Sequence, residues 1–344
     1  MLEVARFVLS LFVAQAHLFP LGAPWIAWMA VFAFYVLSGY LITRVLNTHY
    51  MVDRFSWGGF GAFALNRVLR LWPAYLLVCV LSALLVERAP LTAAQWLTNL
   101  SVVGIVGVDY LHMASFPELA PNAWSLSIEL VCYALLAFGF ARSPRALLMF
   151  ALLGAVALTA STGACTWRGT ELYAPYCFQN RYGVLQAGFI PFAAGGLIYF
   201  YERRAMAFAQ RWIAPIAAAG AAVVLLVAFN PALQFTLAPF AGGAFAALFL
   251  AWALARDFST PITYFLGRAS YHVFISHYAI SRVLTQELQW ERDNPVLLMV
   301  TLCVALLLGF FLIAPLERRI DAVRTAVRER AGSVGAPRPA LAPG

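Results

Sequence analysis

Long apolar runs follow one another along most of the chain and are separated by short segments rich in arginine, glycine and proline. A helix needs about 20 mostly apolar residues to cross the ~30 Å hydrocarbon core of a bilayer. Runs of about that length lie at 4–21, 25–46, 68–87, 122–140, 145–161, 182–201, 212–229, 233–255, 263–286 and 295–315. A shorter run around 96–108 predicts an interfacial or re-entrant piece. The pattern therefore predicts an all-α, polytopic membrane protein with about ten transmembrane helices.

The composition narrows the class of protein further. Of the 344 residues, 63% are hydrophobic and 11% are charged, whereas soluble domains carry about 25% charged residues. This balance excludes an ordinary water-soluble domain. We expect residues 1–330 to form a single transmembrane domain. The stretch 331–344 is rich in Ala, Pro and Gly and predicts a disordered cytoplasmic tail.

The arginines indicate an orientation in the membrane. All 23 basic residues are arginine. With the N-terminus in the cytoplasm, eighteen of them fall on cytoplasmic ends, loops and the C-terminal tail, and five fall on the opposite side. This positive-inside bias predicts that both termini are cytoplasmic. The net charge of +8 belongs to the loops that flank the helices and thus indicates membrane orientation; membrane lipids are expected as partners and nucleic acid is not.

Two cysteines share a predicted outer loop. Cys165 and Cys177 lie twelve residues apart in the sequence. A disulfide between them is expected if that side of the membrane is oxidising, and two free thiols if it is not.

The first apolar run contains two ionisable residues. Arg6 and His17 stand eleven residues apart, which is about three helical turns, so both lie on one helix face roughly 16 Å apart along the axis. Ionisable groups within a membrane helix mark functional sites by default. The competing interpretation is structural: a histidine that bonds a backbone carbonyl and an arginine that extends to the headgroups.

A second polar group stands at the start of the third run. Arg67 and Arg70 are three residues apart and share a helix face. Guanidinium groups bind phosphates through paired hydrogen bonds, so these two predict a phosphate site at the cytoplasmic mouth of the helix. Ordinary positive-inside anchoring explains the same spacing.

Two later helices carry further polar positions. Ser125, Glu129 and Tyr133 follow one stripe at intervals of four residues, and His277 lies near the middle of the ninth run. A structural salt bridge or hydrogen bond is the alternative role for each. The topology places His17, Glu129 and His277 at a similar depth. This predicts a polar cavity whose cytoplasmic approach is lined by arginines; no metal site is expected.

Taken together, these fragments resemble the acyltransferase-3 family of polytopic membrane acyltransferases. The fragments are Arg6 with His17, Phe34-Tyr35-Val36-Leu37-Ser38-Gly39-Tyr40-Leu41-Ile42, Arg67-x-x-Arg70 with Pro73-Ala74-Tyr75, Trp124-Ser125-Leu126-Ser127-Ile128-Glu129, and Ser270-Tyr271 through His277. The resemblance extends over nearly the whole chain. The chain departs from the family pattern at Leu130, where a second acidic residue is common, and at Glu3, where Asp is frequent.

The resemblance implies transfer of a short acyl group, acetyl, from a cytoplasmic acyl-CoA to a hydroxyl of a carbohydrate or glycolipid acceptor. In that reaction Arg67 and Arg70, assisted by Arg6, would bind the phosphates of the donor. His17 would act as general base or carry the acyl group, and Glu129 would orient it.

The acceptor side is implied by the same resemblance. Ser125, Tyr133 and His277 would contact the acceptor, and the protein would be a multi-pass protein of the cell membrane, the bacterial inner membrane. The alternative is a secondary transporter or flippase for a lipid-linked or anionic solute, since buried His and Glu also serve as proton relays. A third interpretation, a structural scaffold, gives no account of ionisable groups at one depth.

Overall fold

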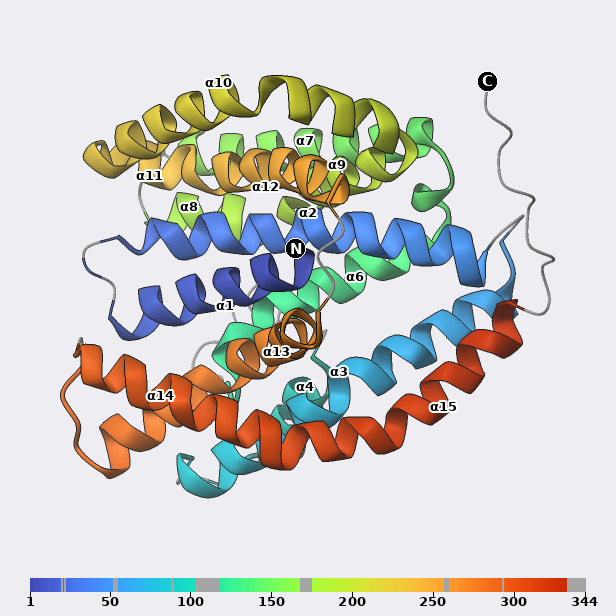
Figure 1. Cartoon of the computed structure of the whole chain (residues 1–344). Coiled ribbons are helices and arrows are strands. Elements are labelled where there is room, and N and C mark those ends of the chain that lie inside the picture. Colours follow the sequence, from blue (N-terminus) through green and yellow to red (C-terminus); the bar gives the residue numbers. More distant parts are fainter. Residues whose placement is uncertain are drawn as a thin grey trace.

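The computed structural model of the chain describes residues 1–19, 21, 23–51, 55–87, 90–102, 118–167, 175–256, 260–292 and 294–332. Every regular element in these ranges is helical (Figure 1). The main helices are α1 (Leu2–Leu18), α2 (Trp25–Val45), α3 (Trp57–Leu85), α4 (Ala93–Ser101), α6 (Trp124–Phe138), α7 (Pro144–Trp167), α8 (Pro175–Tyr182), α9 (Phe189–Phe200), α10 (Glu202–Phe229), α11 (Pro231–Thr236), α12 (Ala238–Leu254), α13 (Pro261–Arg282), α14 (Pro295–Leu308) and α15 (Ala314–Gly332). The predicted all-α class is confirmed.

Each predicted apolar run contains a helix, but not each helix has the length and composition of a membrane span. Within the described ranges, six helical segments are long and apolar enough to cross a membrane. They are Trp25–Tyr50, Trp57–Leu85, Pro121–Phe138, Pro144–Trp167, Glu202–Phe229 and Pro295–Arg330. Leu185–Phe200 and Ala238–Leu254 are shorter apolar helices. The protein is thus a multi-pass membrane protein, whereas ten spans and cytoplasmic termini stay predictions.

Helix α2 is the central element of the bundle. It packs against α1, α6, α9 and α12. In its most apolar stretch 67% of the residues are buried inside the protein, whereas in α10 the share is 6%. Close helix approach depends on glycine here: a Cβ on Gly39 would overlap the backbone of Phe192, and one on Gly195 would overlap the backbone of Val36. Small residues let helices in membranes pack this closely.

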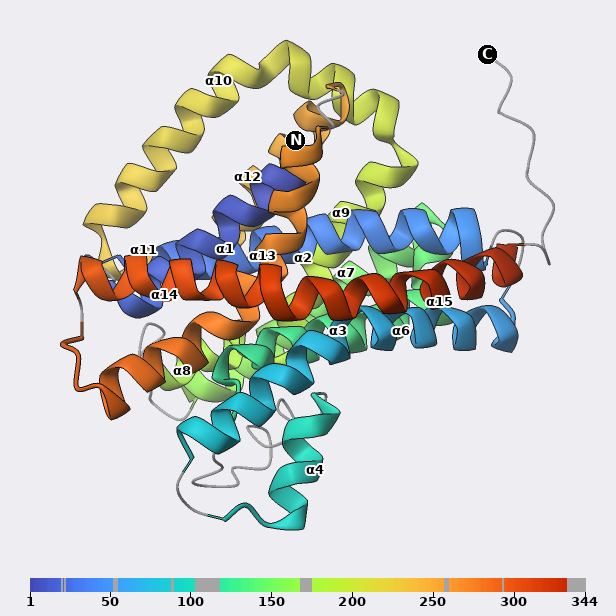
Figure 2. The same cartoon turned by 60° about the horizontal axis from the view of Figure 1, so that its bottom comes forward.

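Helix α10 lies at the edge of the molecule. Figure 2 shows it as an outlying arch beside α9 and α12. Its large side chains Leu225, Leu226 and Phe229 are exposed. Exposed apolar side chains on a helix of this length are what a lipid-facing surface requires.

Helix α3 begins earlier than the sequence predicts. The apolar run starts at 68, but the helix starts at Trp57, with the Ser56 hydroxyl accepting a hydrogen bond from the Gly59 amide at 3.0 Å. The run was placed too late because residues 57–67 contain three glycines and end in the polar pair Asn66 and Arg67, which interrupts the apolar pattern. Arg67 and Arg70 consequently lie in the middle of a 29-residue helix and not at its mouth.

Two other predictions meet the limits of the described residues. Helix α4 occupies the first part of the predicted segment 96–108. The last six positions of that segment lie outside the described residues, so its interfacial or re-entrant character stays a prediction. Helix α15 continues to Gly332, and the predicted disordered tail lies outside the described residues from 333 on.

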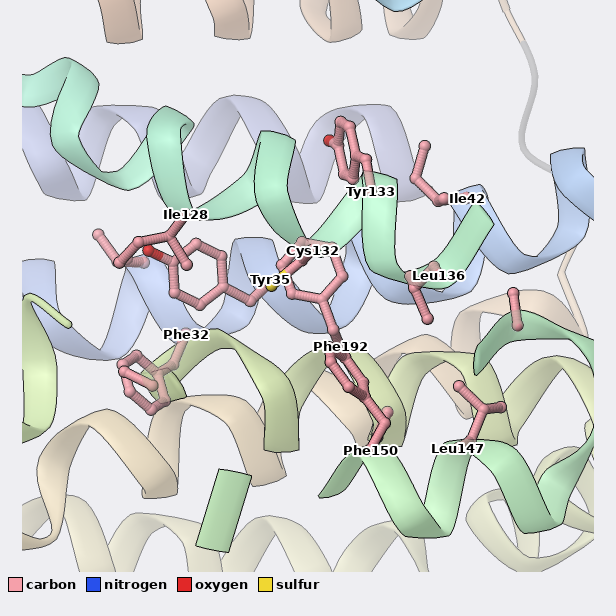
Figure 3. Packing of buried hydrophobic residues seen from close by; sticks show 14 of the residues in the cluster. Phe32, Tyr35, Ile42, Ile128, Cys132, Tyr133, Leu136, Leu147, Phe150 and Phe192 are labelled. Atoms are coloured by element: carbon pink, nitrogen blue, oxygen red, sulfur yellow. The ribbon is translucent and has the colours of Figure 1, made fainter. Parts of the chain in front are cut away.

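The main hydrophobic core lies between α2, α6, α7 and α9. Figure 3 shows Phe32 and Tyr35 from α2 packed with Ile128 from α6 and with Phe192 and Phe150. All five are almost completely buried. These rings hold α6 against α2, and this contact forms one wall of the site described next.

Beside this core, a disulfide links two helices. Cys165 at the end of α7 is bonded to Cys177 in α8, with Cα atoms 5.7 Å apart. Of the two alternatives left open by the sequence, a disulfide or two free thiols, the structure has the disulfide.

Candidate active site

His17 and His277 meet where α1 packs against α13. His17 Nδ1 lies 3.0 Å from His277 Nε2, and the two ring planes differ by only 7°. His277 is completely buried, whereas the side chain of His17 is exposed. The pair brings together residues that are 260 positions apart in the sequence.

The hydrogen bonds of His277 assign the protons of the pair. Its Nδ1 lies 3.0 Å from the carbonyl oxygen of Val273, which can only accept, so Nδ1–H donates. In a neutral ring Nε2 is then unprotonated and accepts from His17 Nδ1–H. This leaves the Nε2 of His17 with a free lone pair. A histidine held in this tautomer is arranged to accept a proton at Nε2.

A cavity lies beside the histidine pair and is lined by residues of α1, α2, α3, α6 and α13. Its charged and hydroxyl-bearing lining residues are Arg6, Tyr35, Ser38, Arg67, Arg70, Ser125, Glu129, Tyr133, Ser270 and Tyr271. Six of the eight predicted site residues therefore share one cavity; His17 and His277 are not among its lining residues.

Glu129 is held inside the cavity by hydroxyl groups. Its carboxylate accepts hydrogen bonds from Ser38 Oγ at 3.2 Å and from the Tyr133 hydroxyl at 2.9 Å. The predicted alignment of Glu129 with Tyr133 on one stripe is confirmed. The hydrogen-bond partner of His17, however, is His277 and not Glu129. Helical spacing aligns residues within one helix but does not fix how neighbouring helices are rotated. The structure shows no direct hydrogen bond between Glu129 and His17, and the role expected for Glu129 in orienting His17 stays a prediction.

The three arginines of the cavity lack close counterions. Among the described residues, Arg6 makes no side-chain hydrogen bond or ion pair. Arg67 Nη2 makes a long contact of 3.3 Å to Asn66, and its buried Nε has no partner. Arg70 lies 3.9 Å from Glu317. The lining thus holds three guanidinium groups against one carboxyl group, that of Glu129. An anionic ligand would balance this charge.

Ser125 also faces the cavity, and its hydroxyl donates to the backbone oxygen of Asn122 at 3.2 Å. Phe274 connects the cavity with the histidines. Its ring lines the cavity, lies 6.4 Å from the ring of His277 and packs edge-on against Phe34 at 6.1 Å. A ligand that extended from the cavity to His17 would meet these two rings.

An ion network beside the cavity was not predicted from the sequence. The Glu317 carboxylate lies 2.7 Å from Arg268, 3.4 Å from His272 and 3.9 Å from Arg70. An acidic residue at the end of a long apolar run was the available signal, but its partners come from α3 and α13. In the described part of the chain, no group of three or more His, Cys, Asp or Glu residues is arranged to hold a metal ion.

The helices and the cavity define the class: a multi-pass membrane protein with an internal cationic cavity beside a histidine pair. The family profile described as an acyltransferase domain matches residues 2–315. The chain therefore belongs to the acyltransferase-3 family, a family of membrane acyltransferases. No curated protein and no solved structure gives a significant match to the chain.

Proposed function

We propose that the protein transfers a short acyl group, acetyl, from a cytoplasmic acyl-CoA to a hydroxyl of a carbohydrate or glycolipid acceptor, as an enzyme of the cell membrane and specifically of the bacterial inner membrane. The observation that carries the proposal is the cavity with three arginines and one carboxyl group beside the His17–His277 pair. A ligand with phosphates at one end and a reactive group at the other suits this arrangement.

The donor phosphates bind at Arg6, Arg67 and Arg70. These guanidinium groups have no counterion closer than 3.9 Å among the described residues, and charged hydrogen bonds to phosphate are among the strongest that a protein makes. The acyl-CoA is a substrate here, and the chemistry itself is carried by side chains of the protein.

His17 acts as the general base. The acceptor hydroxyl attacks the thioester carbonyl while its proton passes to His17 Nε2; the carbon–sulfur bond then breaks, and the leaving thiolate takes up the proton. His277 positions His17 through the 3.0 Å contact, and its expected contact with the acceptor stays a prediction. In an alternative two-step reaction, the acyl group is first transferred from the thiol of the donor to His17, and the acceptor hydroxyl then attacks the acylated histidine.

The remaining residues act on the acceptor side. Ser125 contacts the acceptor directly, and Tyr133 acts through the Glu129 carboxylate that it bonds. Glu129 itself stabilises the positive charge of the cavity, because it is the carboxyl group among the lining residues.

The test is transfer of a labelled acetyl group from acetyl-CoA by the purified protein to a panel of saccharides and glycolipids. The substitution His17→Ala should lower the rate by about 10²–10⁴-fold, the usual contribution of general-base catalysis. The substitution His49→Ala is the matched control, because His49 lies outside the cavity and the histidine pair.

Two outcomes would overturn the proposal. Near-normal acetyl transfer by the His17→Ala protein would show that His17 is not the general base. Movement of a labelled glycolipid into proteoliposomes without any acyl transfer would favour the transporter alternative. Acetylated His17, recovered by mass spectrometry from the protein incubated without acceptor, would select the two-step sequence over direct attack.

A further inference from the structure

Tyr35 carries a hydroxyl group that the fold leaves without a partner. The residue lies in the middle of α2 and is completely buried. Its hydroxyl oxygen makes no hydrogen bond with any described residue. Buried polar groups in proteins are almost always hydrogen-bonded, because an unpaired one retains the full cost of leaving water. Tyr35 also lines the cavity.

The hydroxyl lies towards the start of α2. Side chains of a helix lean towards its N-terminus, and Val31, one turn earlier, lines the same cavity. Figure 3 shows the hydroxyl on the side of Phe32 and Ile128 and away from Ile42.

This position falls between the two ends of the proposed donor site. Helices α1 and α2 run antiparallel (Figure 1) and pack against each other. In Figure 1, α1 lies beside the first half of α2, so Arg6, near the start of α1, is level with the middle of α2, and His17, near its end, is level with the first turns of α2. The Tyr35 hydroxyl, directed back along α2, lies at an intermediate level.

Four of the other hydroxyl groups that line the cavity already have partners. Ser38 and Tyr133 donate to Glu129, Ser125 donates to a backbone oxygen, and the Tyr271 hydroxyl donates to the Leu71 carbonyl at 2.8 Å. The surroundings of the Tyr35 hydroxyl are apolar, so it suits a neutral polar group better than a phosphate.

We infer that the Tyr35 hydroxyl donates a hydrogen bond to a carbonyl oxygen in the arm of the acyl donor, between its phosphates and the transferred group. The inference rests on the proposed function, since it assumes an acyl-CoA donor. The arm of that donor carries amide and thioester carbonyl groups, which are neutral acceptors. Tyr35 is thereby a donor-binding residue, distinct from the arginines that bind the phosphates.

The substitution Tyr35→Phe tests the inference because it removes only the oxygen. The donor KM for acetyl-CoA should rise about three- to tenfold, as expected for one neutral hydrogen bond. Inhibition by adenosine 3′,5′-bisphosphate, which has the phosphates of the donor but no arm, should not change. The substitution Tyr40→Phe is the matched control, since the Tyr40 hydroxyl bonds Glu202 at 3.1 Å and does not line the cavity.

A second readout does not need turnover. Saturating CoA should raise the melting temperature of the wild-type protein by more than it raises that of the Tyr35→Phe protein, and the bisphosphate should raise both equally.

The outcomes separate the two proposals. If wild-type protein transfers acetyl groups and Tyr35→Phe changes neither the donor KM nor the CoA effect, the inference about Tyr35 is overturned and the proposed function stands. Equal weakening of CoA and the bisphosphate also overturns the inference, since the hydroxyl then shapes the whole cavity. Binding of CoA without transfer overturns the proposed function alone, and no binding of CoA overturns both.

Discussion

Two groups of arginines lie side by side in this bundle and differ in their partners. In the α13–α15 ion network, Arg268 lies 2.7 Å from Glu317, and Arg324 lies 2.5 Å from Asp321. In the cavity, Arg6 and Arg67 have no carboxylate within 4.0 Å among the described residues. A guanidinium in low-dielectric surroundings is costly without a counterion. The first group therefore holds helices together, whereas the second group is available to the anionic donor that the proposed function assigns to the cavity.

Arg70 stands between the two groups. It lines the cavity and lies 3.9 Å from Glu317, which is too long for a hydrogen bond. Glu317 has its shorter contacts with Arg268. Arg70 is therefore free to turn towards a ligand without breaking the network.

The largest effect is expected from breaking the network at its centre. Glu317 is 3% exposed, and Glu317→Gln removes the charge that balances Arg268. Removing one member of a buried pair costs about 3–5 kcal/mol, and the partial exposure of Arg268 places the loss at about 3 kcal/mol. The melting temperature of the purified protein measures it.

The matched control is Glu291→Gln, because Glu291 is exposed and makes no ion pair among the described residues. Its melting temperature should be unchanged. A loss for Glu317→Gln no larger than that of the control would remove the distinction between the two groups of arginines.

The sequence predicts the helices better than it predicts this network. Apolar runs located the long apolar helices because burial in lipid requires them, whereas the 19-residue polar helix α15 lies almost entirely beyond the last run. The start of α3 was missed because the polar pair Asn66 and Arg67 interrupts the apolar pattern. A tertiary contact accommodates Asn66 there: its side chain donates to the backbone oxygen of Arg324 at 2.9 Å. Glu317 stands out in the sequence as an acidic residue at the end of an apolar run, but nothing in the sequence identifies Arg268, His272 and Arg70 as its partners.

An intermediate effect is expected in the cavity. The substitution Arg67→Ala removes charged hydrogen bonds to the donor, each worth about 1.5–3 kcal/mol, so the donor KM should rise about 10–100-fold. Because Arg67 has no counterion to lose, the melting temperature without ligand should not fall. Steady-state kinetics with acetyl-CoA and a melting curve of the same sample measure both quantities.

The control for Arg67 is Arg256→Ala, since the Arg256 side chain is exposed and, among the described residues, its hydrogen bond and ring contact are both with Trp252. Both quantities should be unchanged there. An Arg67→Ala protein with lowered stability and a normal KM would show that Arg67 belongs with the structural arginines.

In the site, too, contacts within one helix could be predicted from the sequence, whereas contacts between helices could not. The stripe of Glu129 and Tyr133 follows from helical spacing alone. The contact of His17 with His277 depends on how α1 and α13 are rotated against each other, and the family resemblance assigned the orienting role to Glu129 instead. That the Tyr35 hydroxyl lacks a hydrogen-bond partner can be recognised only from the three-dimensional structure, because its neighbours come from other helices.

The smallest effect is expected at the edge of the network. Asp321 contacts Arg268 at 3.2 Å and Arg324 at 2.5 Å, but its side chain is 34% exposed. Exposed ion pairs contribute about 0.2–1 kcal/mol, because water already solvates both charges. The substitution Asp321→Asn should therefore lower the stability several times less than Glu317→Gln, and added salt should abolish the difference from wild type. A loss equal to that of Glu317→Gln would mean that the carboxylates act as one unit, and that exposure does not separate their contributions.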